Sequence, residues 1–279
     1  MYGLLHSSKR KVILYSSVKV NINKGYNDWM TIVYRDIEYG SHERQKLDIY
    51  LPKHVPKSTI IFWHGGSWLS GDKSSYNLFA KSLTKLGVAV VATNYRLFPD
   101  ARWNTIIEDG ARATAWVQNN IQDYGVETQN IIAMGHSAGA YIAAMLVLEK
   151  TYLSKAKVKS NNIKGFIGLS GPYDFDPRKK LRPIFDIKDK LKKWLPISYP
   201  GQIHIPVLLL HGRFDRFVPP RNSKRLAKAL EQNGCKVVLK IYPTLEHLMI
   251  LPAVVRGFRW LAPVRRDIKR FLVDNNLVQ

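Results

Sequence analysis

Short apolar runs alternate with segments of helical periodicity along most of the chain. The runs that predict strands are residues 59–63, 88–93, 130–134, 165–170, 206–210 and 237–242. The segments that predict helices are residues 74–86, 105–124, 138–150, 222–233 and 252–273. This alternation is typical of a doubly wound α/β domain, in which helices on both faces connect parallel strands. The pattern therefore predicts one α/β domain over residues 1–279, with a mostly parallel sheet of about eight strands.

The first part of the chain departs from the alternation. Residues 12–20, 31–38 and 46–50 each predict a strand, and no helical segment separates them. We therefore expect antiparallel strands that lead into the parallel sheet. Residues 1–30 carry no motif, and we interpret them as an N-terminal accessory arm. Residues 171–205, between the sixth and seventh strand signals, form a short basic insert near the predicted active site.

The pentapeptide Gly-His-Ser-Ala-Gly at residues 135–139 joins a predicted strand to a predicted helix. A serine hydroxyl becomes a nucleophile when it stands clear of the backbone beside a base. A tight strand-to-helix turn presents it in this way only if the residues two before and two after are small. Gly135 and Gly139 meet that need, so Ser137 is the candidate nucleophile.

Such a serine needs a histidine as base and a carboxylate that orients the histidine. His247 lies in the loop after the last predicted strand, and Asp215 lies in the loop after the strand at 206–210. The chain order of serine, acid and histidine is the one expected for a nucleophile-elbow hydrolase. The rival acids are Asp174, Asp176 and Glu246, of which none has the same chain order and strand-end position.

The remaining histidines give no sign of a metal site. His136 fills the variable position of the elbow and His211 ends a strand, so we interpret both as structural. No pair of histidines has the spacing of metal ligands, and we therefore expect neither a metal nor a cofactor.

Hydrolysis of an acyl compound also requires backbone N–H groups where the carbonyl oxygen becomes negative. The sequence His-Gly-Gly-Ser-Trp at residues 64–68 follows a predicted strand and offers such groups. We assign the oxyanion hole to the N–H groups of Gly65, Gly66 and Ala138, and substrate binding to Trp68.

These motifs together resemble the α/β-hydrolase superfamily, and in particular its HGG-type carboxylesterases, which include hormone-sensitive-lipase-like, acetyl- or feruloyl-esterase-like and kynurenine-formamidase-like enzymes. The resemblance begins near Gln45 and also includes residues 47–52, residues 94–99 and His211-Gly212. Two features depart from the hormone-sensitive-lipase pattern. Ser67 stands where a third glycine is usual, and His136 and Ala140 stand where Asp and Gly are usual. The resemblance therefore implies a smaller esterase or formamidase with an α/β-hydrolase fold.

Composition bears on the compartment. Cys235 is the single cysteine of 279 residues, which excludes an intrachain disulfide and is compatible with a reducing cytoplasm. The apolar stretch after Lys9, Arg10 and Lys11 is too short for a signal peptide, and no run is long enough to span a membrane. These features predict a cytoplasmic protein.

The net charge of +22 is the least ordinary bulk property, and it concentrates in the insert. Residues 178–193 contain eight basic and two acidic residues. Ile187, Leu191, Trp194 and Leu195 have helical spacing, which would suit a basic amphipathic helix that docks on an anionic membrane or covers the pocket. The alternative, a solvated basic face over an apolar stripe that packs on the sheet, is the one we favour.

Three functions fit this sequence. The first is a serine carboxylesterase that acts on small esters through an acyl-enzyme, with a preference for short acyl chains because the insert is too small for a large lid. The second keeps the same residues and cleaves an amide, as a formamidase or small peptidase does. The third is a catalytically silent protein that binds anionic surfaces. The complete triad favours the first two over the third, and no motif indicates specific nucleic-acid binding.

Overall fold

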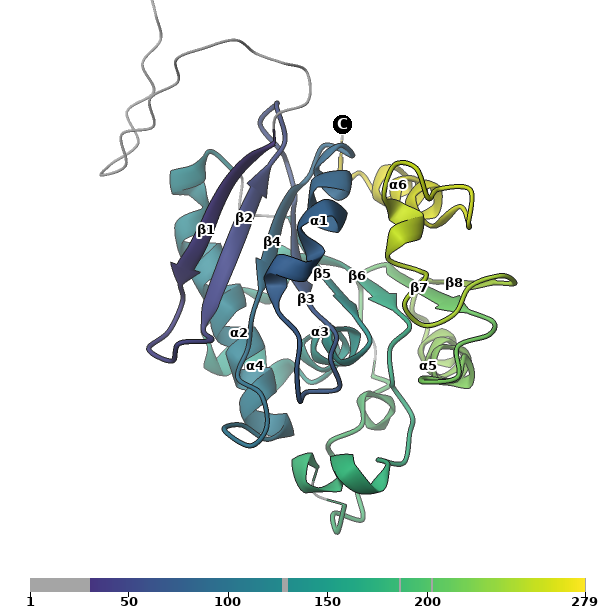
Figure 1. The fold of residues 1–279 in the computed structure, drawn as a ribbon. Coiled ribbons are helices and arrows are strands. Elements are labelled where there is room, and N and C mark those ends of the chain that lie inside the picture. The colour runs from purple at the N-terminus through teal and green to yellow at the C-terminus, as the bar shows by residue number, and fades with distance from the viewer. Residues whose placement is uncertain (1–30, 127–129, 186, 202, 279) are drawn as a thin grey trace, which may run out of the picture. The chain divides into compact units, whose positions relative to one another are not determined.

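The computed structural model describes residues 31–126, 130–185, 187–201 and 203–278. These residues contain one sheet of eight strands in the order β1-β2-β4-β3-β5-β6-β7-β8 (Figure 1). The strands are β1 Ile32–Glu38, β2 Lys46–Leu51, β3 Thr59–Trp63, β4 Ala89–Thr93, β5 Ile131–His136, β6 Ile163–Leu169, β7 Val207–Gly212 and β8 Val237–Tyr242. The α-helices are α1 Asn77–Thr84, α2 Trp103–Asn120, α3 Ala138–Leu148, α4 Lys150–Lys155, α5 Arg221–Gln232 and α6 Val264–Asp274.

The direction of the strands agrees with the sequence pattern. β1 pairs with β2 and β2 pairs with β4 in antiparallel fashion, whereas every other pair is parallel. The register places Trp63 of β3 beside Gly135 of β5, and His136 of β5 beside Leu169 of β6. The carboxyl ends of the central strands therefore lie at the same edge of the sheet, where loops from distant parts of the sequence meet.

The two faces of the sheet carry separate cores because side chains alternate along each strand. Ile61 and Trp63 point to the face that α2, α3, α4 and α5 cover. Ile60 and Phe62 point to the opposite face, where α1 and α6 pack. Figure 1 shows α1 and α6 in front of the sheet, with α2, α3 and α4 behind it.

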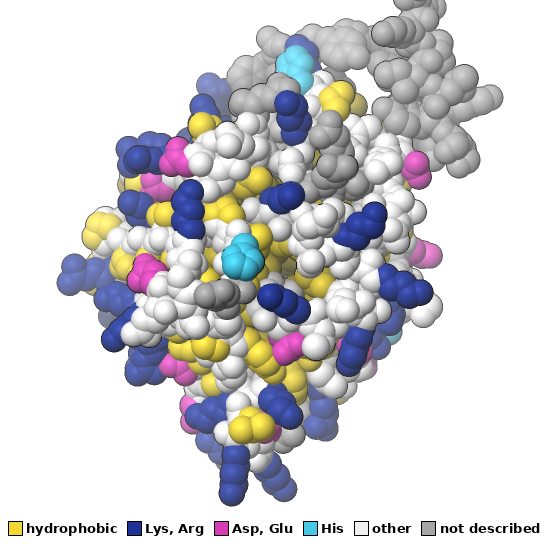
Figure 2. Space-filling model, turned by 180° about the vertical axis from the view of Figure 1, so that it is seen from behind, with side chains coloured by type: hydrophobic (Ala, Val, Ile, Leu, Met, Phe, Trp, Pro, Cys, Tyr) yellow, Lys and Arg dark blue, Asp and Glu magenta, His cyan; other side chains and the backbone are white. Residues whose placement is uncertain are grey.

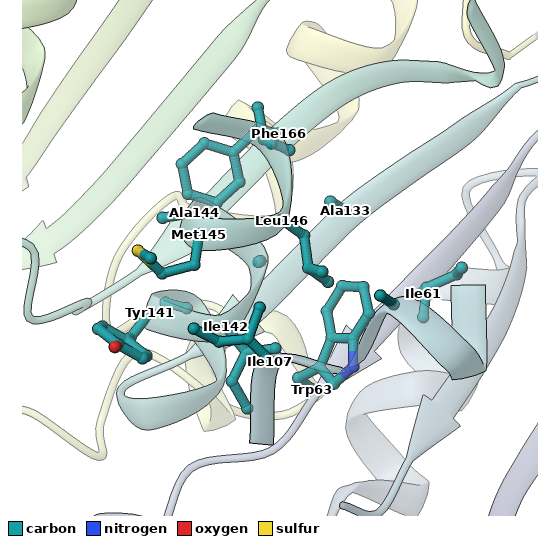
Figure 3. Packing of buried hydrophobic residues seen from close by; sticks show 14 of the residues in the cluster. Ile61, Trp63, Ile107, Ala133, Tyr141, Ile142, Ala144, Met145, Leu146 and Phe166 are labelled. Atoms are coloured by element: carbon teal, nitrogen blue, oxygen red, sulfur yellow. The ribbon is translucent and has the colours of Figure 1, made fainter. Parts of the chain in front are cut away.

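α3 is the most deeply buried helix of the described residues. All of its residues from Ala138 to Leu148 are buried, and Figure 3 shows Tyr141, Ile142 and Met145 among side chains of the sheet and of α2. A helix that is apolar on every side can form only in such surroundings. This burial holds the amino end of α3, which follows Ser137 directly, in a fixed position.

The structure corrects two predicted helices. Residues 252–273 do not form one helix: a short 3₁₀ turn covers Pro252–Val254, and α6 begins only at Val264. Gly257 has a φ of 98°, and Pro263 precedes the first residue of α6. A positive φ interrupts a helix, and proline lacks the N–H that an interior position needs. The helical pattern at 138–150 likewise divides, because Glu149 has extended backbone angles between α3 and α4.

The amphipathic helix that the insert's periodicity suggested is also absent from the described residues 187–195. The Asp189 carboxylate accepts hydrogen bonds from the backbone N–H groups of Leu191 and Lys193, and Lys192 has a φ of 48°. Such side-chain bonds compete with the helical ones. Trp194 is buried while Leu191 is exposed, so the apolar side chains do not share one face.

Other predictions concern smaller points. The strand expected at 12–20 and the arm at 1–30 lie outside the described residues. The helix expected at 74–86 is a 3₁₀ turn at Lys73–Tyr76 followed by α1. Cys235 is buried between α5 and β8. In the described part of the chain, no helix combines the length and the apolar character that a membrane crossing needs.

Candidate active site

Ser137 occupies a sharp turn between β5 and α3. Its φ of 54° and ψ of −119° lie outside the regions that a side chain normally allows. Both neighbouring glycines are needed for the turn. A Cβ on Gly135 would lie 2.2 Å from the backbone of Gly139, and a Cβ on Gly139 would lie 1.9 Å from the carbonyl oxygen of Trp63. The turn therefore requires glycine at both places and lifts the serine side chain toward the edge of the sheet.

Three side chains form a continuous hydrogen-bonded line at this edge. The Ser137 hydroxyl lies 2.8 Å from Nε2 of His247, and Nδ1 of His247 lies 2.7 Å from Oδ2 of Asp215. The carboxylate keeps the imidazole proton on Nδ1, so Nε2 is left to accept the serine proton. All three residues are buried, with at most 8% of each exposed. This geometry allows proton transfer from Ser137 to His247.

Asp215 is held by more than its bond to His247. Its Oδ1 accepts hydrogen bonds from the backbone N–H groups of Phe217 at 3.0 Å and Val218 at 2.8 Å. Burial alone would raise the pKa of Asp215, but hydrogen bonds from His211 and His247 outweigh it and hold that pKa well below the usual value. Asp215 is therefore a carboxylate near neutral pH.

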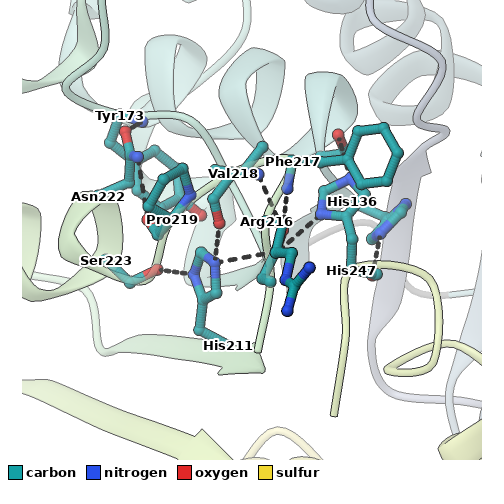
Figure 4. A network of polar contacts seen from close by, with 12 residues as sticks. His136, Tyr173, His211, Arg216, Phe217, Val218, Pro219, Asn222, Ser223 and His247 are labelled. Atoms are coloured by element: carbon teal, nitrogen blue, oxygen red, sulfur yellow. Dashed lines mark hydrogen bonds and ion pairs between the residues drawn. The ribbon is translucent and has the colours of Figure 1, made fainter. Parts of the chain in front are cut away.

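His211 is a second histidine beside the same carboxylate. Figure 4 shows its ring between Ser223 and Val218. Its Nε2 lies 2.7 Å from the carbonyl oxygen of Val218 and 3.2 Å from Oδ2 of Asp215. Both oxygens near Nε2 can only accept, so the proton lies on Nε2, and Nδ1 accepts a hydrogen bond from the hydroxyl of Ser223 at 2.8 Å. The sequence analysis interpreted His211 as structural and missed its contact with Asp215. The spacing of four residues between them was the available signal.

The rival acids lie elsewhere. Asp174 pairs with Arg225 of α5 at 2.7 Å, Asp176 is exposed at the pocket mouth, and Glu246 points to solvent. Of the four acids considered from the sequence, the structure brings only Asp215 to His247.

His136, between Gly135 and Ser137, forms a hydrogen bond that holds the backbone of His247. Its Nε2 donates to the carbonyl oxygen of His247 at 3.1 Å. Burial lowers the pKa of His136 to about 3, so its ring is neutral. A Cβ on Gly65 would lie 2.8 Å from Nδ1 of His136, which shows how closely the loop after β3 approaches the elbow.

The loop after β3 presents backbone N–H groups to the site, but not in the combination predicted. The N–H of Gly65 already donates to the hydroxyl of Tyr76 at 3.0 Å. The N–H groups of Gly66 and Ser67 have no hydrogen-bond partner among the described residues. Ala138 is the first residue of α3, where a helix leaves its N–H groups unpaired. Gly66, Ser67 and Ala138 are therefore the available donors, and the sequence analysis missed Ser67 because it considered only the glycines.

The buried side chain of His64 holds the backbone of this loop in place. Its ring stacks on Tyr95 with centroids 4.4 Å apart, and its Nδ1 donates to the carbonyl oxygen of Gly65 at 2.7 Å. Burial lowers the pKa of His64 to about 4. Gly66 has a φ of 133°, and a Cβ there would lie 1.9 Å from the carbonyl oxygen of Ser70. The backbone of the loop is thus determined by buried contacts and by the absence of a side chain.

A cavity of about 580 Å³ opens over Ser137. Two walls bound it, because β3 and β7 lie on opposite sides of β5 in the sheet. The "β3 wall" consists of the lining residues within 65–76, and the "β7 wall" consists of those within 172–181 and 217–222. The insert at 171–205 thus supplies part of the β7 wall, as its predicted place near the active site suggested.

Trp68 lines the cavity and is 3% exposed. Its indole stacks on Phe175 of the β7 wall at a centroid distance of 5.9 Å and meets Tyr141 edge-on at 5.2 Å. The aromatic cluster therefore joins the two walls beneath the pocket. No group of three potential metal-ligating side chains occurs among the residues that the structure describes.

Comparison with known proteins places this site in a family. The BD-FAE family model matches residues 47–230, which include Ser137 and Asp215. The chain is 31% identical over 252 residues to a probable isoprenylcysteine alpha-carbonyl methylesterase of Arabidopsis thaliana, covering 81% of this chain and 53% of that protein. It is 28% identical over 230 residues to kynurenine formamidase of Danio rerio, covering 79% and 76%.

The fold also resembles solved structures. Thermogutta terrifontis esterase 2 phosphonylated by sarin superimposes with a TM-score of 0.75 at 20% identity, over 91% of this chain and 98% of that one. The chain spans little more than half the length of the first methylesterase relatives, from 53% to 61%. The match of the family model and the parallel sheet with its serine elbow lead to one conclusion: this chain belongs to the BD-FAE family and has the α/β-hydrolase fold of the HGG-type carboxylesterases.

Proposed function

We propose that the protein is a serine carboxylesterase that cleaves small esters through an acyl-enzyme. The observation that carries the proposal is the hydrogen-bonded line from Ser137 through His247 to Asp215, next to unpaired N–H groups. The names of the relatives agree, since they include methylesterases and esterases.

Acylation follows from the geometry. The Ser137 oxygen attacks the ester carbonyl while its proton moves to Nε2 of His247, and the carbonyl oxygen becomes an oxyanion. The N–H groups of Gly66, Ser67 and Ala138 donate to that oxyanion. His247 then returns its proton to the leaving alkoxide, the ester C–O bond breaks, and the alcohol departs. The acyl group remains on Ser137.

Deacylation repeats these steps with water. His247 takes a proton from a water molecule whose oxygen attacks the acyl carbonyl, and then protonates Ser137 as the acid product leaves. Asp215 remains ionised throughout and stabilises the imidazolium. We further propose that short acyl chains are preferred, because the cavity holds about 580 Å³ and the short insert at 171–205 supplies part of its wall.

A test uses Ser137→Ala. We expect it to abolish covalent labelling by a fluorophosphonate and to lower kcat for 4-nitrophenyl acetate by at least about 10³-fold, because only an activated serine reacts with both. Ser154→Ala, on the exposed surface of α4, is the matched control and should retain both activities. Labelling of Ser137→Ala at the parent rate would overturn the assignment.

The amide-hydrolase alternative keeps the same residues and changes the bond that breaks. The formamidase relatives give it support, although they are not more similar to the chain than the methylesterases. Turnover of N-formylkynurenine at a higher kcat/KM than that of short 4-nitrophenyl esters would favour it. The silent-protein alternative has no support in the site, because all three triad side chains are in place.

A further inference from the structure

Three cationic side chains line the β7 wall of the pocket. Arg178 and Lys180 come from the insert, and Arg221 is the first residue of α5. All three are exposed, and none forms an ion pair with an acid in the described part of the chain. Cleavage by a carboxylesterase does not require cations, so the proposed reaction does not explain these three side chains.

Backbone contacts hold this cationic wall next to the catalytic base. The Arg178 guanidinium donates to the carbonyl oxygens of Arg216 at 3.4 Å and Phe217 at 3.5 Å. The Phe217 ring in turn lies 5.7 Å, centroid to centroid, from the imidazole of His247. Arg178 is therefore tied to the loop that also contains Asp215, and it lines the same cavity as Ser137.

A second set of hydrogen bonds fixes the backbone beside Arg221 at the start of α5. The side-chain oxygen of its neighbour Asn222 accepts hydrogen bonds from the N–H groups of Tyr173 and Asp174, at 3.0 and 2.9 Å. These bonds join the start of the insert to the amino end of α5. The positive end of the α5 dipole adds to the charge of Arg221 at the same place.

The acids of the pocket do not cancel this charge. Asp176 is the single acid of the β7 wall, against three cations. Asp72 belongs to the β3 wall, and its carboxylate already accepts hydrogen bonds from Asn94 at 2.6 Å and from the N–H of Ser74 at 2.8 Å. Asp174, nearby in the insert, is paired with Arg225. The β7 wall therefore carries three cations and one acid, and with Asp72 the whole lining of the cavity over Ser137 carries three cations and two acids.

We propose that Arg178, Lys180 and Arg221 form an anion subsite, which makes esters that carry a carboxylate a few bonds from the scissile carbonyl the preferred substrates. This inference rests on the proposed esterase function and adds the chemical class of the substrate. Guanidinium and ammonium groups bind carboxylates through charge-assisted hydrogen bonds.

The high net charge of the whole protein requires a control, because any cationic surface attracts anions. Figure 2 shows Lys and Arg side chains spread over the back of the molecule, with fewer Asp and Glu between them. Diffuse attraction of this kind raises encounter rates and is screened by salt. A true subsite depends on three particular side chains, whereas diffuse attraction depends only on total charge.

The first experiment compares 4-acetoxybenzoate with 4-acetoxybenzamide, which differ in charge and little in size, at about 0.15 M salt. We expect the ratio of their kcat/KM values to favour the carboxylate by at least tenfold in the parent. The triple variant Arg178→Gln, Lys180→Gln, Arg221→Gln should bring that ratio close to one. The triple variant Lys150→Gln, Lys157→Gln, Lys164→Gln, at the opposite edge of the sheet, loses the same charge and should keep the parent ratio.

The second experiment measures binding without turnover. Calorimetry with Ser137→Ala should give tighter binding of 4-acetamidobenzoate than of 4-acetamidobenzamide, and the cationic triple variant in that background should lose the difference. If the carboxylate ligand binds more tightly but the parent turns over no ester, the anion subsite is supported and the esterase function is overturned. Ester turnover with no charge preference, or an equal loss of preference in both triple variants, would overturn the subsite and leave the esterase standing.

Discussion

The two walls of the pocket are built from different material. The β3 wall contributes backbone: it carries the N–H groups proposed as oxyanion donors, its angles need glycine at Gly66, and the buried ring of His64 bonds to it. The β7 wall contributes exposed side chains, among them Arg178 and Phe217, on loops tied to one another by hydrogen bonds. Under the proposed function, the chemistry that every substrate shares would lie in the backbone, and discrimination between substrates would lie in side chains that can change.

Asp215 does not fit this division between the walls: it lies in the same loop as part of the β7 wall, but its side chain is buried. We expect Asp215→Asn to lower kcat by about 10³-fold or more, because an amide neither stabilises the imidazolium nor selects the correct tautomer. Asp174→Asn and Asp176→Asn should change kcat less than threefold. Steady-state kinetics with 4-nitrophenyl acetate decides the matter, and a larger loss for Asp174→Asn would move the catalytic acid to the insert.

Gly66→Ala tests the β3 wall directly. The new Cβ would meet the carbonyl oxygen of Ser70, so the loop must shift and the N–H groups of Gly66 and Ser67 must move with it. Loss of one oxyanion donor lowers kcat by roughly 10²-fold or more. Gly87→Ala is the matched control, since Gly87 has a φ of 88° at the other edge of the sheet with open space around it. If kcat falls equally in the two variants, the loss in Gly66→Ala comes from backbone strain and not from displacement of the oxyanion donors.

His211→Ala examines how far the buried support of the β7 wall matters. The variant loses the hydrogen bonds to Val218 and Asp215, and we expect about a tenfold fall in kcat with KM nearly unchanged, because the acid is less well oriented. Ser223→Ala keeps both of those bonds and should fall less than threefold. If both variants behave alike, His211 serves only the fold.

The smallest effect concerns pH and stability. His64 and His136, with pKa values near 4 and 3, are neutral in the folded protein but take up protons near pH 6.5 when unfolded. The unfolded state binds more protons in this window, so stability is complete above pH 6.5 and falls as the pH drops toward 4. The expected slope is on the order of 1 kcal/mol per pH unit for each histidine.

Chemical denaturation of the parent and of His64→Gln between pH 4.5 and 7.5 measures this effect. The variant should show a shallower dependence. Carboxylates contribute mainly below that range, because the shifted pKa values of Asp72 and Asp215 are lowered from 3.8. An identical slope in parent and variant would mean that His64 is not the group that titrates.

Much of this molecule was predictable because its chemistry sits at strand ends. Ser137 and Asp215 follow directly or closely on β5 and β7, and parallel strands bring such positions together whatever lies between them. The helix that the apolar spacing around Leu191 allowed does not form, because the hydrogen bonds that the Asp189 side chain accepts from the backbone leave no trace in an apolar periodicity. The Ser67 N–H, a donor in the proposed oxyanion hole, was missed for a related reason: backbone donors do not depend on the type of side chain.

The backbone angles of Ser137 have a consequence for heat resistance. A residue held at a φ of 54° and a ψ of −119° costs the folded state roughly 1–3 kcal/mol, whereas glycine adopts such angles at little cost. A protein with glycine at this position would unfold at a higher temperature than one with alanine, and neither would react. At the position of Ser137, the backbone angles that present the hydroxyl therefore lower the stability of the folded protein. In any sequence that keeps the serine, the two hydrophobic cores of the sheet must offset this loss of stability.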